Sequence, residues 1–209
     1  MRLGPTSRTG WFVAVTIVAA NAASAAAQLA PREALGVPVP ADMPRLVPSV
    51  NNKSAEGKLF IGTNSGPGYL LVFENDGTPY FYRQLASPTY DFKIQSAGVL
   101  SYWEGPPLNG WVTLDHAFAP IDTLRGTSPY ETNHHGFQLL PDGHALFIVD
   151  EKRQRDMSEV VYGGYPDAVI LGQHVQELDA DGNLVMEWRS WDHFEITDTW
   201  QRLTSANID

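Results

Sequence analysis

Histidines are the side chains best suited to chemistry in this chain, which has six of them and no cysteine. His193 directly follows Asp192 and comes shortly after Arg189, so a carboxylate that could orient the imidazole and a cation that could hold an anion are close in sequence. His135 stands at the start of an apolar segment. We therefore take His135 and His193 as candidate catalytic residues and Arg189 as a candidate substrate-binding residue. The simpler alternative is that both histidines only satisfy hydrogen bonds in turns.

The other histidines give weaker signals. His116 and His144 stand beside predicted turns and are expected at the surface, while His174 precedes a strand and is expected to be structural or exposed. On a strand, His134 and His135 should point to opposite faces. No HExxH or similar ligand spacing, dinucleotide fingerprint or phosphate-binding loop occurs, so the sequence predicts neither a metal site nor a cofactor.

Short segments rich in β-branched and aromatic residues must position these side chains. From residue 53 onward they alternate with glycine-containing turns, and none has a helical period over three turns. The sequence therefore predicts an all-β chain. The expected strands are Leu59–Gly62, Tyr69–Phe73, Tyr80–Tyr82, Val99–Trp103, Trp111–Leu114, Gly136–Leu140, Ala145–Val149, Ala168–Leu171 and Leu184–Trp188.

A weak repeat relates some of these strands. The segments YLLVFENDGTPYFYRQ and HVQELDADGNLVMEWRS each place a strand, an acidic Asp-Gly turn and a second strand that ends in an aromatic residue and arginine. Short antiparallel strands in a repeat of roughly 40–50 residues favour propeller blades, while a sandwich or barrel stays open. Trp188 and Trp191 are then interpreted as packing residues. Residues 53–209 would hold about three to four blades, so we expect an incomplete N-terminal portion of a propeller, truncated at its C-terminal end.

The first 27 residues have the order of a secretory signal peptide. Arg2 and Arg8 precede an apolar run, and small residues up to Ala27 suit cleavage. The run is too short to span a bilayer, so a membrane anchor is the less favoured alternative. Residues 28–52 are rich in proline and are expected to form an extended lead-in or linker. We therefore expect an exported protein, periplasmic or secreted, whose folded part is residues 53–209.

Charge narrows the set of partners. The formal net charge of −10 repels nucleic acid and anionic lipid, so neither is an expected partner. No segment after the leader is long and apolar enough to cross a bilayer, so no membrane insertion is expected after cleavage. Since the chain has no cysteine, burial of its core must hold it together without disulfides.

Three segments resemble arylsulfotransferase-like proteins. The first match is NHHGFQLLPDGHALFIVDEKRQRDMS, which resembles the family's segment of His, an acidic residue, Phe, a strand and then Pro-Asp/Asn-Gly. The second is AVILGQHVQELDADGNLVMEWRSWDHFEITDT, which resembles its Gln-Glu-(Ile/Leu)-Asp and Glu-Trp-Arg-Ser-x-Asp-His segment. The segment WVTLDHAFAPIDTL is similar to the hairpin that the family has just upstream. The resemblance covers about residues 57–209 in consistent order, and the Glu-Trp-Arg-Ser-x-Asp-His run is its most specific part.

The resemblance implies a six-bladed propeller that transfers a sulfuryl group from a phenolic sulfate ester to a phenol acceptor. The nucleotide donor PAPS is not used, and a histidine is transiently sulfated while cations and N–H donors hold the sulfate oxygens. His135 and His193 match two histidines of the family, with Gly136 in place of its usual acidic residue. A further Asp-x-x-His-x-Asn segment would start near Asp209, so the nucleophile is expected beyond it and this chain alone could be an inactive fragment.

Two other functions are compatible with the same sequence. One is a non-catalytic exported propeller that binds a glycan, a peptide or a small anion, since propellers carry many unrelated functions. The other is hydrolysis of sulfate esters, with water as the acceptor.

Overall fold

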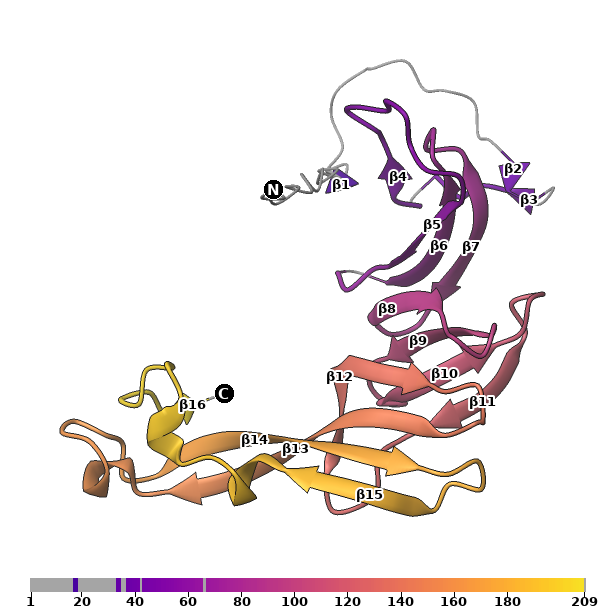
Figure 1. Ribbon diagram of the computed structural model, residues 1–209. Helices are drawn as coiled ribbons and strands as arrows, with labels where there is room; N and C mark the ends of the chain where they lie inside the picture. Colours follow the sequence, from indigo (N-terminus) through magenta and orange to yellow (C-terminus); the bar gives the residue numbers. More distant parts are fainter. Residues whose placement is uncertain (1–16, 19–32, 35–36, 42, 66, 209) are drawn as a thin grey trace, which may run out of the picture. The chain divides into compact units, whose positions relative to one another are not determined.

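The computed structural model describes residues 17–18, 33–34, 37–41, 43–65 and 67–208. These residues form two compact units (Figure 1). The first comprises Met1–Phe60 and Tyr69–Gln84, and the second comprises Ile61–Gly68 and Leu85–Asp209. The described residues contain β-strands and short 3-10 turns and no α-helix, so the prediction of an all-β chain is confirmed.

Most residues of a three-stranded sheet in the order β5-β6-β7 belong to the first unit. Its strands are β5 (Lys58–Gly62), β6 (Gly68–Glu74) and β7 (Pro79–Leu85). Two short antiparallel pairs lie earlier in the chain: β1 (Ile17–Val18) with β4 (Arg45–Leu46), and β2 (Glu33–Ala34) with β3 (Val37–Pro38). Except for β1, the predicted signal peptide lies outside the described residues.

The second unit begins with a four-stranded antiparallel sheet in which each strand pairs with the next in the chain. Its strands are β8 (Thr89–Ile94), β9 (Leu100–Glu104), β10 (Gly110–Leu114) and β11 (Pro120–Leu124). The sequence did not predict β8. A register shift between Tyr90 and Lys93 interrupts the period-two alternation of this strand, and Asp91 has a φ of 48° there.

The second sheet of this unit positions the candidate residues. Its antiparallel strands follow one another in the chain as β12 (Glu131–Leu139), β13 (Ala145–Arg155), β14 (Ala168–Leu178) and β15 (Leu184–Arg189). A short strand, β16 (Asn207–Ile208), pairs with β14 in parallel (Figure 1). The three 3-10 turns are η1 (Met157–Glu159), η2 (Ser190–Asp192) and η3 (Ile196–Asp198).

The Asp-Gly turns behave as the sequence predicts. Gly77, Gly143 and Gly182 have φ values of 85°, 88° and 82°, in the left-handed region that glycine enters without steric cost. They close the β6–β7, β12–β13 and β14–β15 hairpins. The positions of these turns are therefore specified by local sequence.

A core of aromatic side chains joins the two sheets of the second unit. Trp111 of β10 is fully buried, and its ring stacks on Phe137 of β12 at a centroid distance of 5.0 Å. Phe147 and Val149 of β13 belong to the same core cluster. The indole N–H of Trp111 donates to the backbone oxygen of Asn133, 3.1 Å away. This bond ties the core to the strand that carries two of the histidines.

A bulge in β12 overturns one expectation. Thr132 pairs with Val149, and the next paired residue of β12 is Phe137, which pairs with Phe147. The extra residues between these pairs break the alternation of side chains between faces. The rings of His134 and His135 consequently lie 3.8 Å apart, so the expectation that they point to opposite faces is wrong.

In the part of the chain that the structure describes, no helix is long and apolar enough to cross a membrane. Export of the protein remains a prediction, and so does the expectation that residues 53–209 form its folded part.

Candidate functional site

His135 is exposed, and the amide of Asn133 orients its ring. The Oδ1 atom of Asn133 accepts from the backbone N–H of His135 at 2.6 Å and lies 3.0 Å from the ring Nδ1. The Nδ2 atom of Asn133 donates to both carboxylate oxygens of Asp150, each 2.8 Å away, which fixes the amide orientation. Because an amide oxygen only accepts, Nδ1 carries the hydrogen of the neutral ring and Nε2 keeps its lone pair.

His134 provides a second imidazole beside the first. Its ring packs against Tyr90 at 4.4 Å and against Trp103 at 5.3 Å. Burial lowers the pKa of His134, as does the nearby charge of His135, and Asp150 opposes both effects. His134 is therefore neutral at physiological pH and can accept or relay a proton.

The register of the sheet gathers a second group of ionisable side chains. His174 on β14 pairs with Val149 on β13 and with Arg189 on β15. Glu151 pairs with Gly172, two residues along from His174, so its side chain reaches the same face of the sheet. A glutamate, a histidine and an arginine from three different strands thus meet on one face.

His174 is fully buried and hydrogen-bonded through both ring nitrogens. Its Nε2 lies 2.8 Å from Oε2 of Glu151, and its Nδ1 accepts from the backbone N–H of Ser190 at 3.1 Å. Nδ1 is therefore the acceptor and Nε2 carries the hydrogen. Tyr130 packs edge-on against the ring at 5.1 Å.

Glu151 is the anionic centre of this group. Arg153 donates through Nε at 2.7 Å, and Arg189 donates through Nη2 at 3.1 Å. Burial raises the pKa of Glu151, but hydrogen bonds from Arg153 and His174 and the charges of both arginines outweigh it and bring the pKa to about 2. Arg189, the candidate substrate-binding residue, is thus already paired with a carboxylate.

His193 lies just past the end of β15, where η2 follows the strand. Its ring stacks on the indole of Trp188 at 5.1 Å with an interplanar angle of 4°. Phe194 meets the same indole edge-on at 6.0 Å. His193 is exposed, and an aromatic surface orients its imidazole.

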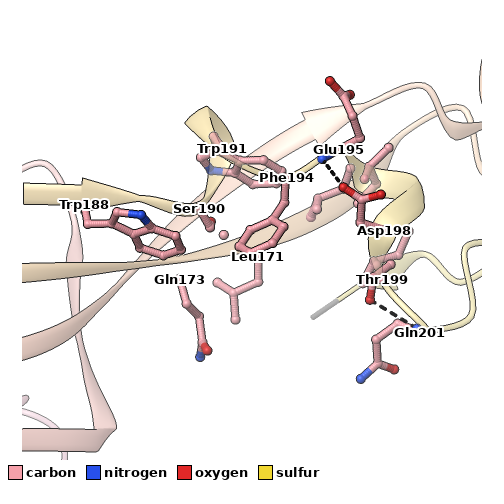
Figure 2. A pocket seen from close by; sticks show the side chains of 14 residues that line it. Leu171, Gln173, Trp188, Ser190, Trp191, Phe194, Glu195, Asp198, Thr199 and Gln201 are labelled. Atoms are coloured by element: carbon pink, nitrogen blue, oxygen red, sulfur yellow. Dashed lines mark hydrogen bonds between the residues drawn. The ribbon is translucent and has the colours of Figure 1, made fainter.

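An open pocket of about 570 Å³ adjoins this segment, within the size range of small-molecule sites. Figure 2 shows the aromatic side chains of Trp188, Trp191 and Phe194 around it, with Gln173 and Asp198 among the polar residues of its wall. The two tryptophans were expected only to pack, yet both are half-buried and line this pocket.

Gly172 is expected to be required for the shape of this pocket. A Cβ at this position would overlap the indole of Trp191, whose other contacts include the guanidinium of Arg153 at 4.9 Å. Gly172→Ala should displace the ring and destabilise the protein by about 1–3 kcal/mol. Urea unfolding measures the loss. Gly182→Ala serves as a comparison, because its Cβ would meet no atom and only its φ of 82° opposes the change. Native-like stability of Gly172→Ala would contradict this close packing.

The remaining histidines lie at turns, as the sequence predicts. His116 is exposed. His144 is half-buried, and its Nδ1 lies 2.7 Å from Oε1 of Glu177, a hydrogen bond that raises its pKa. Among the described residues, neither His116 nor His144 has a hydrogen bond or ring contact with His134, His135, His174 or His193.

The structure brings together His134 with His135, and Arg189 with His174, but it does not bring His135 and His193 together. No contact joins these two exposed histidines in the described part of the chain.

Sequence analysis missed His174 and Glu151 as a group. The alternation along β14 could have placed His174 on the buried face with Ile170, whereas its pairing with Glu151 required the register of β13.

Within the described residues, no group of three or more histidine, aspartate or glutamate side chains is arranged to hold a metal ion.

No protein-family model matches this chain, and a search of curated proteins finds no significant match. The likeness to arylsulfotransferase-like proteins therefore stays a prediction from the sequence motifs.

Proposed function

We propose that this protein is an arylsulfotransferase-like propeller that transfers a sulfuryl group from a phenolic sulfate ester to a phenol, and that His135, in place of the histidine expected beyond Asp209, is the residue that is transiently sulfated. The ordered motif matches support the family. The fold is compatible with it, because three sheets follow one another along the chain and each joins consecutive strands, apart from β16, which pairs with β14 in parallel. Propeller blades are four-stranded sheets of consecutive strands.

The observation that carries this proposal is the chain of hydrogen bonds from Asp150 through Asn133 to His135. It holds Nδ1 of His135 in the protonated form, which leaves the lone pair on Nε2. A nucleophilic imidazole needs this arrangement: one nitrogen fixed by a neighbour and the other exposed to substrate. His135 is exposed, so a sulfate ester can approach it.

The reaction follows from this geometry. Nε2 of His135 attacks sulfur, an N–S bond forms, and the S–O bond to the phenol breaks. The phenolate takes up a proton from solvent water as it leaves, and His134 later returns to solvent the proton that it accepts from the acceptor phenol. An acceptor phenol then loses its proton, attacks the same sulfur and restores the imidazole. Splitting the transfer at a histidine replaces one difficult displacement by two easier ones.

His134 is the proposed proton carrier. Its ring is 3.8 Å from that of His135, and its lowered pKa keeps it neutral and able to take the proton of the acceptor phenol. In this proposal neither His193 nor Arg189 contacts His135 directly. The guanidinium of Arg189 is bound to Glu151, so it binds a sulfate oxygen of the substrate only if that oxygen displaces the carboxylate.

The protein should release 4-nitrophenol from 4-nitrophenyl sulfate when a phenol acceptor is present. His135→Ala should lower the rate by about 100-fold or more, and Asn133→Ala by about 10- to 100-fold because it loses only the orientation of the ring. His116→Ala, which removes an exposed histidine at a turn, should leave the rate unchanged. Absorbance of nitrophenol measures turnover. Mass spectrometry after a rapid quench should find the sulfuryl group on the peptide that contains His135.

Equal release by the native protein and His135→Ala would contradict the proposal, as would a sulfated peptide from elsewhere in the chain. Acceptor-independent release would assign hydrolysis instead of transfer. No release at all would favour the non-catalytic alternative, a propeller that binds a glycan, a peptide or a small anion.

A further inference from the structure

Ser190, His174 and Glu151 are arranged as a nucleophile, a base and an orienting carboxylate. The hydroxyl of Ser190 lies 3.4 Å from Nδ1 of His174, whose Nε2 lies 2.8 Å from Oε2 of Glu151. We propose that these residues form a second reactive site, which hydrolyses carboxylic esters of small aromatic alcohols in the pocket beside Ser190. This site is separate from the proposed sulfuryl transfer and does not depend on it.

The protonation pattern of His174 is the one that a serine nucleophile needs. Since Nε2 donates to Glu151, the lone pair is on Nδ1, the nitrogen nearest the Ser190 hydroxyl. The backbone N–H of Ser190 also donates to this lone pair, at 3.1 Å against 3.4 Å for the hydroxyl, so the hydroxyl has to displace it before its proton can move to Nδ1. In unliganded enzymes the bond between hydroxyl and base is often long and shortens when substrate binds.

Glu151 is the positioning residue of this group. It remains ionised at any pH above its pKa of about 2, because two arginines and His174 hydrogen-bond to it. An ionised carboxylate fixes the tautomer of the imidazole and stabilises the imidazolium that forms when the serine loses its proton. Its separate contact with Arg153 keeps the other carboxylate oxygen in place.

The pocket defines the class of substrate. Ser190 belongs to its wall, between Trp188 and Trp191 (Figure 2). Aromatic side chains on either side of the hydroxyl suit a flat, apolar group, and a volume of about 570 Å³ admits one or two rings. Glu195 and Asp198 also line the pocket, so an anionic sulfate ester is disfavoured relative to a neutral carboxylic ester.

The steps balance without any co-reactant other than water. The hydroxyl of Ser190 first displaces the backbone N–H from Nδ1 of His174. Its Oγ then bonds to the ester carbon while its proton moves to Nδ1. The bond from carbon to the alcohol oxygen breaks, and the alcohol leaves with that proton. Water then gives a proton to Nδ1 and attacks the acyl carbon. The bond from carbon to Oγ breaks, Nδ1 returns the proton to Oγ, and the acid is released.

A fluorophosphonate probe tests the site directly, because it reacts with a serine hydroxyl only where a neighbouring base activates it. The peptide that contains Ser190 should be labelled, and Ser190→Ala should abolish this label. Hydrolysis of 4-nitrophenyl acetate should fall by about 100-fold or more in the same variant. Ser190→Ala keeps the backbone N–H that bonds His174, so the variant should fold and unfold as the native protein does.

Ser158→Ala is the matched control. Ser158 is an exposed serine that also sits in a 3-10 turn, with its hydroxyl bonded to Asp156. This variant should keep the label and the hydrolysis rate. Neither readout uses a sulfate ester, so failure of sulfuryl transfer leaves this test intact. Absence of label on Ser190, or native ester hydrolysis in Ser190→Ala, overturns the proposal and makes the contact purely structural.

Discussion

Replacing Glu151 with alanine is expected to destabilise the protein by about 2–4 kcal/mol, although the side chain lies partly at the surface. Glu151 accepts the Nε2–H of His174, which is completely buried, and it also neutralises Arg153 and Arg189. Alanine would leave a buried N–H without a partner and two cations without their carboxylate. Urea unfolding followed by tryptophan fluorescence measures the loss.

Two comparisons identify the cause. Glu151→Gln keeps an oxygen that can accept from His174 and removes only the charge, so it should cost less than alanine. Glu131→Ala removes a more exposed ion pair with Lys152 and should change stability by less than about 1 kcal/mol. A loss of less than about 1 kcal/mol for Glu151→Ala would show that His174 needs no anionic partner.

The same carboxylate should make stability depend on pH. The pKa of Glu151 is about 2 in the folded protein, below the 4.5 of an unperturbed glutamate. Since the folded state binds the proton more weakly, this group contributes its full stabilisation above about pH 4.5 and loses it as the pH falls towards 2. The free energy of unfolding should therefore decline across this window. In Glu151→Gln the decline should be shallower, and equal slopes would contradict the assignment.

Replacing Trp111 with alanine should cost about 3–5 kcal/mol, the largest effect we expect from a single core residue. Its indole is fully buried, stacks on Phe137 and donates its N–H to the backbone oxygen of Asn133. The change would leave a cavity between the two sheets and an unpaired carbonyl beside His135. It should therefore also lower the proposed sulfuryl transfer.

Trp200→Ala is the control for this variant. Trp200 is 97% exposed, so removing it should change stability by less than about 0.5 kcal/mol. Chemical unfolding of both variants gives the comparison. Similar stability of Trp111→Ala and Trp200→Ala would mean that the two sheets of the second unit do not share this core.

The strands and hairpins could be read from local sequence because their causes are local. Period-two runs of aromatic and β-branched residues specified most strands, and the Asp-Gly pairs specified the turns that close the β12–β13 and β14–β15 hairpins. One of the strands that the sequence did not predict, β8, contains an irregularity at Asp91 that breaks this period. The propeller, by contrast, concerns how sheets close around an axis, and it stays a prediction.

The candidate site was less accessible to sequence reasoning. The role of His135 stays a prediction, and the hydrogen bonds from Asn133 that orient its ring were not foreseen. Its ring neighbour, His134, was expected on the opposite face. The bulge that places them together is not encoded in a residue type. Arg189 was taken for a substrate-binding residue, whereas the structure pairs it with Glu151.

The sequence by itself determined most of the segments that become strands, the positions of the Asp-Gly turns and the acidity of the protein, because each depends on neighbouring residues or on composition. Only the tertiary structure decided which side chains meet. Glu151 and His174 are 23 residues apart in the chain and 2.8 Å apart in space, and this distance follows from the register of two long strands. A shift of that register by one residue would turn Glu151 to the other face, and no local pattern records the difference.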